Sequence, residues 1–145
     1  MQELFVPLAL SAVLIGVCLY LHFKVLRSVG SQMTAINERF RYPMLVVMMV
    51  IFLTHLAEII IFTVAFWVMT MTGIGSLAGA HSSTPADFFY FSIASYTTLG
   101  MGDIAPEGAV RIVAGLEALT GLLLIAWSAS FTYLTMESVW APEKD

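Results

Sequence analysis

Charged side chains are scarce in this sequence. Asp, Glu, Lys and Arg make up 11% of the 145 residues, whereas about a quarter of the residues in a soluble domain are charged. Apolar residues make up 59%, and the mean hydropathy is +0.90. This composition excludes an ordinary soluble domain, and the lack of a basic patch excludes a nucleic-acid-binding protein. We therefore expect a membrane protein with lipid as a partner and no nucleic acid.

Several motifs are also missing. Cys18 is the only cysteine, so the chain has no disulfide framework. There is no glycine-rich phosphate loop with a lysine and no nucleophile elbow, so we expect neither an enzyme nor a bound cofactor. No apolar stretch repeats arginine at every third position, which excludes a voltage-sensing helix of the usual kind.

Three apolar stretches are long enough to cross a bilayer as helices, which takes about 20 residues. They cover approximately residues 4–23, 44–72 and 109–136. Positive charges gather on the cytoplasmic side of membrane proteins, and here they lie between the first two stretches, at Lys24, Arg27, Arg39 and Arg41. We therefore expect a multi-pass protein of the cell membrane with its N-terminus outside and its C-terminus in the cytoplasm.

The segment between the second and third stretches predicts a short helix that enters the membrane and returns. Thr84 is a candidate N-cap, Pro85 suits the first helical position and Asp87 suits the first turn. The apolar helix predicted at residues 86–97 is too short to span the bilayer. Irregular backbone at membrane depth survives only when buried in protein or beside water, so the segment after this helix is expected to line a wet axis.

The run after this helix reads Thr97-Thr98-Leu99-Gly100-Met101-Gly102-Asp103. Glycine adopts positive φ at little steric cost, so Gly100 and Gly102 allow successive carbonyl groups to face one axis. A dehydrated cation needs such a set of backbone oxygens. Taken alone, the pattern is also compatible with a loop at a helix end.

The run resembles the selectivity filter of the potassium channel pore-loop family, which typically reads Thr-Val-Gly-Tyr-Gly-Asp. The resemblance implies an all-α, homotetrameric pore-loop channel with three transmembrane helices, a re-entrant pore helix and a filter. Residues 1–42 would hold an additional transmembrane helix and a cytoplasmic connector, and the pore domain would cover residues 43–137. Its parts would be an outer helix 43–72, a turret 73–85, a pore helix 86–97, a filter 98–103 and an inner helix 107–137, before a short cytoplasmic tail 138–145.

By the same resemblance, permeant K⁺ would bind the filter at Thr98, Leu99, Gly100, Met101 and Gly102, with no other metal. Tyr96, Thr97 and Asp103 would support the filter. Met101 replaces the usual aromatic residue, Tyr90-Phe91 replaces the usual aromatic pair, and Ala94 replaces an acid that some members keep behind the filter. Conduction is therefore predicted more securely than selectivity for K⁺ over Na⁺.

Glu117 is an acid inside the third apolar stretch, where a charged group needs a partner. It could pack behind the pore helix and bond Ser95, Tyr96 or Thr97, which would support the filter. It could instead be a protonated carboxyl group that Thr120 or a neighbouring helix satisfies.

Helical spacing along this stretch places several residues on one face, which is expected to line the cavity or form a gate: Leu123, Ala126, Ser130, Phe131 and Leu134. Phe131 and Leu134 would form an apolar constriction. Gly115 and Gly121 are candidate hinges, although small residues also allow close helix packing.

His55 and Glu58 lie three residues apart in the second stretch, on one face of a helix. They could modulate the protein with pH, or form a structural contact with Glu117 or with the first helix. Two ligands are too few for a typical metal site. His22 and His81 are expected to be interfacial or exposed.

The predicted function is a passive cation channel, selective for potassium. Alternatives are a weakly selective monovalent-cation channel, a proton- or metal-coupled transporter using His55, Glu58 and Glu117, and a subunit that conducts only with a partner. We find no inverted repeat of the kind common in transporters.

Overall fold

The computed structural model describes residues 2–79 and 84–140 of the chain. Within these residues, three helices are long and apolar enough to cross a membrane. They are α1 (Gln2–Ser31), α3 (Pro43–Met71) and α5 (Val110–Trp140). These helices confirm the prediction of a predominantly α-helical, multi-pass membrane protein.

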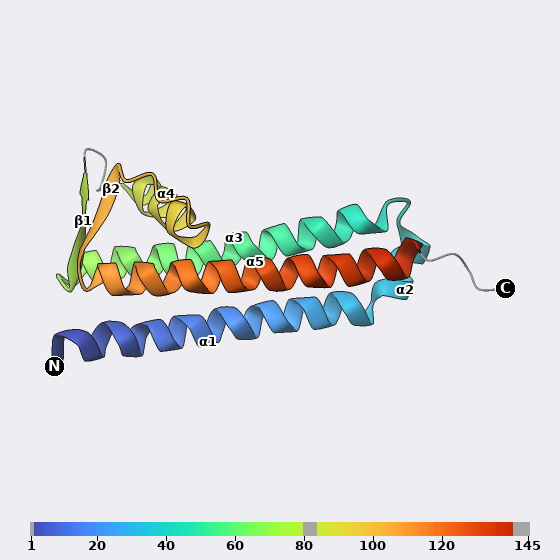
Figure 1. Cartoon of the computed structure of the whole chain (residues 1–145), viewed down its shortest axis with the longest axis horizontal. Coiled ribbons are helices and arrows are strands. Elements are labelled where there is room, and N and C mark those ends of the chain that lie inside the picture. Colours follow the sequence, from blue (N-terminus) through green and yellow to red (C-terminus); the bar gives the residue numbers. More distant parts are fainter. Residues whose placement is uncertain (1, 80–83, 141–145) are drawn as a thin grey trace.

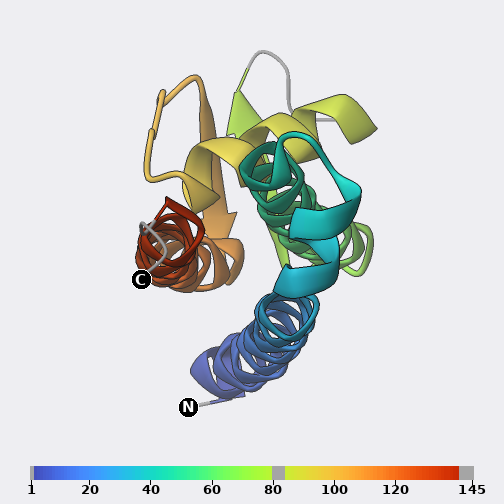
Figure 2. The ribbon, with the colours of Figure 1, turned by 90° about the vertical axis from the view of Figure 1, so that its right-hand side faces the viewer.

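The three long helices run side by side along the length of the molecule (Figure 1). α1 and α5 point in the same direction, and α3 runs opposite to both, so the chain ends lie at opposite ends of the bundle. Viewed along the bundle, α4 (Pro85–Tyr96) lies over α3 and α5 and on the side away from α1 (Figure 2). Contacts of α4 with both α3 and α5 fix its position.

The start of α4 is set by its sequence, as predicted. The Thr84 side chain accepts a hydrogen bond from the backbone N–H of Asp87, and the Asp87 carboxylate accepts one from the Thr84 N–H. This reciprocal capping satisfies N–H groups that a helix leaves free at its start. Pro85 occupies the first turn, where its missing N–H costs nothing.

The connector between the first two long helices is mostly helical. α1 continues to Ser31, and α2 (Met33–Arg39) follows it. Residues of α1 and α3 at this end form one apolar cluster, to which Met33 and Ile36 of α2 add contacts. This burial stabilises helix in a segment whose polar composition alone suggests a loop.

A two-stranded antiparallel sheet forms at the other end of the bundle, where no strand was predicted. β1 (Gly75–Gly79) pairs with β2 (Ile104–Gly108), with Gly75 opposite Gly108 and Gly79 opposite Ile104. Gly75 has no room for a side chain, because a Cβ atom there would lie 2.8 Å from the Glu107 carbonyl oxygen. β2 also delays α5 to Val110, three residues later than the inner helix predicted at 107–137.

The main apolar core lies around the aromatic rings of α3 and α4. Phe66 packs edge to face against Phe91 with ring centroids 5.2 Å apart. Cys18 of α1 and Leu124 of α5 are fully buried in the same cluster, so α1, α3, α4 and α5 share one core. This core supports the segment between α4 and β2.

Candidate ion pathway and the polar cluster behind it

The exposed segment that joins α4 to β2 contains the predicted filter, residues 98–103. Its N–H groups are held by the end of α4: Thr98 donates to the Ser95 carbonyl oxygen at 2.9 Å, and Leu99 and Gly100 both donate to that of Ala94, at 2.9 and 3.2 Å. Within the described part of the chain, no hydrogen bond ends on the carbonyl oxygens of residues 98–102. The first three N–H groups of this segment are therefore bonded to the end of α4, whereas the carbonyl oxygens of residues 98–102 have no partner among the described residues.

The backbone of the segment alternates in handedness. Thr98, Gly100 and Gly102 have positive φ angles of 58°, 54° and 81°, whereas Leu99 and Met101 do not. Glycine adopts positive φ at little steric cost, so Gly100 and Gly102 suit this alternation. Thr98 is the only described non-glycine residue with positive φ, a conformation that costs roughly 1–2 kcal/mol for an L-residue.

Asp103 ends the segment and ties it to α4. The Tyr90 hydroxyl donates to Asp103 Oδ1 at 3.1 Å, and the Ile104 N–H donates to the same oxygen at 3.1 Å. The hydrogen bond raises the pKa of the Tyr90 phenol above its ordinary value, because ionisation would place a second negative charge beside the carboxylate. Tyr90, which sequence reasoning recorded only as a departure from the family, is therefore a partner of Asp103.

A buried polar cluster lies at the base of the segment, around Glu58 of α3. The Tyr96 hydroxyl, at the last residue of α4, donates to Glu58 Oε2 at 2.5 Å. His55 Nδ1 lies 2.9 Å from the Tyr96 hydroxyl and 3.3 Å from Glu58 Oε2. The pair predicted at His55 and Glu58 is thus joined to Tyr96, which directly precedes Thr97.

His22 also belongs to this cluster, and the expectation that it is interfacial or exposed is wrong. Its side chain is fully buried, with Nδ1 2.9 Å from Glu58 Oε1 and Nε2 3.0 Å from Ser128 Oγ. His55 Nε2 lies 3.0 Å from the same Ser128 oxygen. The structural contact that we considered between the second stretch and the first helix is therefore present. His81 lies outside the described residues.

The sequence contained a signal for His22, because a titratable residue within an apolar span marks a functional site by default. Ser128 carried no such signal, since serine is common in membrane helices.

Glu117 lies behind α4 but bonds a different residue from those predicted. Its Oε1 is 2.5 Å from the Ser92 hydroxyl, which also lies 2.9 Å from the Ile59 carbonyl oxygen. Thr120 bonds the Leu116 carbonyl oxygen of its own helix instead. Glu117 Oε2 is buried without a hydrogen-bond partner in the described part of the chain. Glu117 therefore contacts α4 through Ser92, not through Ser95, Tyr96 or Thr97.

The two candidate hinge glycines differ. At Gly121, which is buried, a Cβ atom would overlap the Tyr96 carbonyl oxygen and lie 2.9 Å from the Tyr96 carbonyl carbon. At Gly115 no described atom outside its own helix backbone lies within 4 Å of that position. The lack of a side chain at Gly121 therefore allows α5 to contact the end of α4. The space around Gly115 is open.

Four of the predicted cavity residues, Leu123, Ala126, Ser130 and Leu134, are exposed on α5. Leu123 is 55% exposed and Leu134 63%. Phe131 differs, because its ring lies 3.7 Å from the position of a Cβ at Gly30 of α1 and packs on the α1–α3 cluster. The structure separates Phe131 from the other four.

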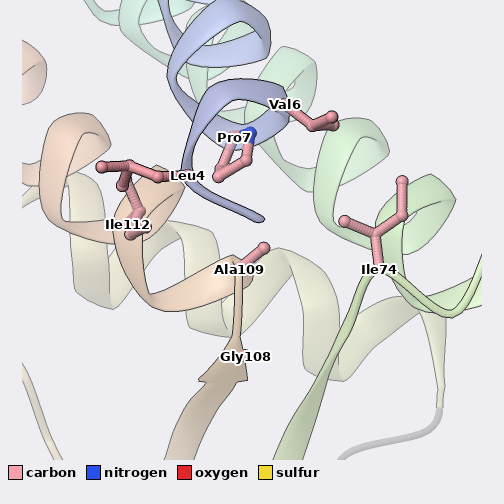
Figure 3. A pocket seen from close by; sticks show the side chains of 7 residues that line it. All are labelled: Leu4, Val6, Pro7, Ile74, Gly108, Ala109 and Ile112. Carbon is pink, nitrogen blue, oxygen red and sulfur yellow. The ribbon is translucent and has the colours of Figure 1, made fainter. Parts of the chain in front are cut away.

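An apolar pocket lies away from the filter, where the start of α1 meets β2 and α5 (Figure 3). Its lining side chains carry no titratable or polar group: Leu4, Val6, Pro7, Ile74, Gly108, Ala109 and Ile112. Its side chains offer no ligand for an ion, so the segment of residues 98–103 stays the candidate pathway.

Comparison with known families agrees with this arrangement. A family described as ion channel matches residues 50–137, a region that contains most of α3, all of α4, the filter segment and most of α5. This is more than half of the chain, so the protein belongs to the ion channel family. The chain matches none of the curated proteins or solved structures with which it was compared.

Membership of this family confirms the resemblance to pore-loop channels, which rested on residues 97–103. The protein is an ion channel of the membrane, with three long apolar helices. α1 lies outside the matched region, yet its His22 completes the polar cluster at the base of the filter segment.

Proposed function

We propose that four copies of this chain form a potassium channel whose filter consists of the backbone carbonyl groups of residues 98–102. The observation that carries this proposal is the state of those carbonyls: they have no hydrogen-bond partner within the described residues, while the N–H groups of Thr98, Leu99 and Gly100 are bonded to the end of α4. Unsatisfied carbonyls are costly in hydrocarbon and favourable around a dehydrated cation. The alternating backbone handedness supports the same assignment.

In this proposal α4 is the re-entrant pore helix. Its 12 residues span roughly 18 Å at 1.5 Å per residue, too little for a hydrocarbon core of about 30 Å. The filter segment returns the chain to the sheet end of the bundle, where α5 begins. We assign this end to the outside and the basic α1–α3 connector to the cytoplasm, because of the positive charges in the connector.

A fourfold assembly would cover surfaces that a single chain leaves exposed. Met101 is 62% exposed and Leu123 55%. One chain carries one filter segment, and a closed ring of ligands requires several copies. In the tetramer, we expect the exposed α5 face to line the cavity, with Leu134 as its constriction.

A weakly selective monovalent-cation channel is the second candidate, and Met101 favours it. A methionine side chain donates no hydrogen bond, so the filter lacks the bond that a tyrosine at this position would make behind it. The transporter alternative has less support, because Glu117 bonds Ser92 and shares no hydrogen bond with His55 or Glu58.

Flux into liposomes that contain only the purified chain tests this proposal. We expect K⁺ flux that barium blocks, little Na⁺ flux and none of a large organic cation. Equal K⁺ and Na⁺ flux would establish the weakly selective channel instead. Uptake against a gradient coupled to protons, or no flux from the purified chain, would overturn the proposal.

Gly100→Ala should abolish flux, because alanine at a φ of 54° is strained. The matched control is Gly16→Ala, on open surface of α1, which should retain flux.

A further inference from the structure

We propose that His22, His55 and Glu58 form a binding site for one divalent transition-metal ion, for which Zn²⁺ is the test. The site would join α1 and α3 directly behind the filter, and the Tyr96 hydroxyl of α4 would bond its Glu58 ligand. Water would fill the fourth position, as it does at sites with three protein ligands. The site is separate from the permeant-ion pathway, because it uses side chains in the interior of one chain. The inference does not depend on which cation the filter conducts.

The donor atoms already converge. His22, His55 and Glu58 each place one ligand atom within 4.8 Å of the others. Zinc prefers four ligands at about 2.0–2.2 Å in a tetrahedron, which places ligand atoms about 3.4 Å apart. Movements on the order of 1 Å or less would therefore convert these contacts into a coordination shell, and two imidazoles with a carboxylate suit zinc.

The contacts that the two histidines make through Nε2 are compatible with metal binding through Nδ1. A neutral imidazole that binds a metal through Nδ1 carries its hydrogen on Nε2. Both Nε2 atoms lie 3.0 Å from Ser128 Oγ, and a hydroxyl oxygen has two lone pairs that accept both hydrogens. Such a second shell, which orients the ligating rings, is usual at metal sites.

With both imidazoles neutral, the cluster has too few hydrogens for its contacts. It contains five close contacts, from Glu58 to His22 and Tyr96, from Tyr96 to His55, and from Ser128 to each histidine. Two neutral imidazoles, one phenol and one hydroxyl supply a hydrogen each, one fewer than the contacts need. A bound cation removes the shortage, because it replaces the hydrogens on the Nδ1 side and balances the buried Glu58 carboxylate.

The position of the site would allow it to affect the filter. Glu58 and His22 are fully buried, whereas the His55 side chain is 16% exposed. Tyr96 directly precedes Thr97, and its carbonyl group touches Gly121 of α5. A metal whose Glu58 ligand bonds Tyr96 would therefore hold the base of the filter against the helix that lines the cavity.

Isothermal titration of the chelator-treated, detergent-purified channel with Zn²⁺ tests this proposal. We expect one Zn²⁺ per chain, and loss of this binding in His22→Ala and in His55→Ala. Ser128→Ala should weaken binding by about 10- to 100-fold, as loss of a second-shell partner does. His81→Ala is the control, since His81 is the third histidine of the chain and should bind as the wild type does.

Cobalt binding provides a second measurement. It uses the wild-type channel, so it does not depend on whether the variants fold. Co²⁺ added to the wild-type channel should give the visible absorption of a tetrahedral site, and Zn²⁺ should remove it. A wild-type channel that binds no Zn²⁺ overturns the proposal and leaves the cluster as a hydrogen-bonded network that holds an extra proton. Binding that persists in His22→Ala and His55→Ala, or that is lost in His81→Ala, also overturns it. Neither experiment measures ion flux or current, so their results do not depend on whether the channel proposal is correct.

Discussion

Gly121 sets the closest approach between α5 and the end of α4. A Cβ atom at this position would overlap the oxygen of the Tyr96 carbonyl group. Backbone atoms cannot move aside as a flexible side chain can. Steric crowding at this one residue therefore fixes the distance between the inner helix and the residue that precedes the filter.

We predict that Gly121→Ala destabilises the protein by roughly 1–3 kcal/mol, the usual cost of overpacking. Thermal unfolding of the purified protein measures this change. Gly115→Ala is the matched control, because it adds the same atom to the same helix in open space, and it should unfold as the wild type does. Equal melting of the two variants would contradict the assignment of Gly121 to packing.

Tyr90 bonds Asp103, at the end of the proposed filter segment that leads into β2. Its pKa is raised, so the stabilisation from this bond is complete below the ordinary phenol pKa of about 10 and is lost as pH rises above the raised value. We predict that wild-type flux falls only at strongly alkaline pH.

Tyr90→Phe should reduce flux severalfold at neutral pH and abolish that alkaline fall. Liposome flux as a function of external pH measures both effects. Tyr20→Phe, at an exposed residue of α1, should keep the wild-type profile. A Tyr90→Phe channel with unchanged flux and an unchanged alkaline fall would exclude a role for this bond.

At the scale of elements, α4 is held to its neighbours by buried polar contacts as well as by apolar packing. Ser92 lies close to both the Ile59 carbonyl oxygen of α3 and Glu117 of α5. The Ser92 hydroxyl has one hydrogen, so both contacts are hydrogen bonds only when the Glu117 side chain donates one of them. A protonated carboxyl group can donate, and so can the amide of glutamine.

We therefore predict that Glu117→Gln leaves stability and flux close to those of the wild type. Ser92→Ala should cost roughly 1–2 kcal/mol, as the loss of an interhelical hydrogen bond in a membrane does, because it leaves Glu117 without a partner. Thermal unfolding measures both. Ser11→Ala is the matched control, since Ser11 is buried and its hydroxyl has no hydrogen-bond partner among the described residues. Equal melting temperatures of Ser92→Ala and Ser11→Ala would contradict a stabilising role for the Ser92 bonds.

The long helices could be predicted from the sequence, and the sheet could not. Apolar runs and the capping residues around Thr84 act locally, so they indicate α3, α4 and α5 to within a few residues. β1 has no alternating pattern, and it forms because β2 pairs with it across the whole of α4. Packing against α3 likewise stabilises the helical connector.

At the scale of the whole molecule, the segment proposed as the filter could be located from the sequence, whereas its surroundings could be located only in part. Residues 97–103 are contiguous, so their resemblance to a filter motif can be read directly from the sequence. The polar cluster depends on contacts between residues far apart in the chain: His22 lies 36 residues from Glu58 and 106 from Ser128. Only the packing of α1 against α3 and α5 brings these side chains together.

α1 is more than an additional membrane anchor, because it contributes side chains to the interior of the molecule. It contributes Cys18 to the main core and His22 to the cluster behind the filter. We infer that the pore region matched by the ion channel family works here with a support that α1 supplies from outside that region.

The reversal potential of the purified wild-type channel in a planar bilayer, with K⁺ on one side and Na⁺ on the other, tests the central claim most directly. A filter built from the carbonyls of residues 98–102 predicts single-channel currents that reverse far from zero, toward the K⁺ equilibrium potential, and that disappear in Gly100→Ala. A reversal potential at zero would exclude potassium selectivity. Currents that persist unchanged in Gly100→Ala would contradict the filter itself.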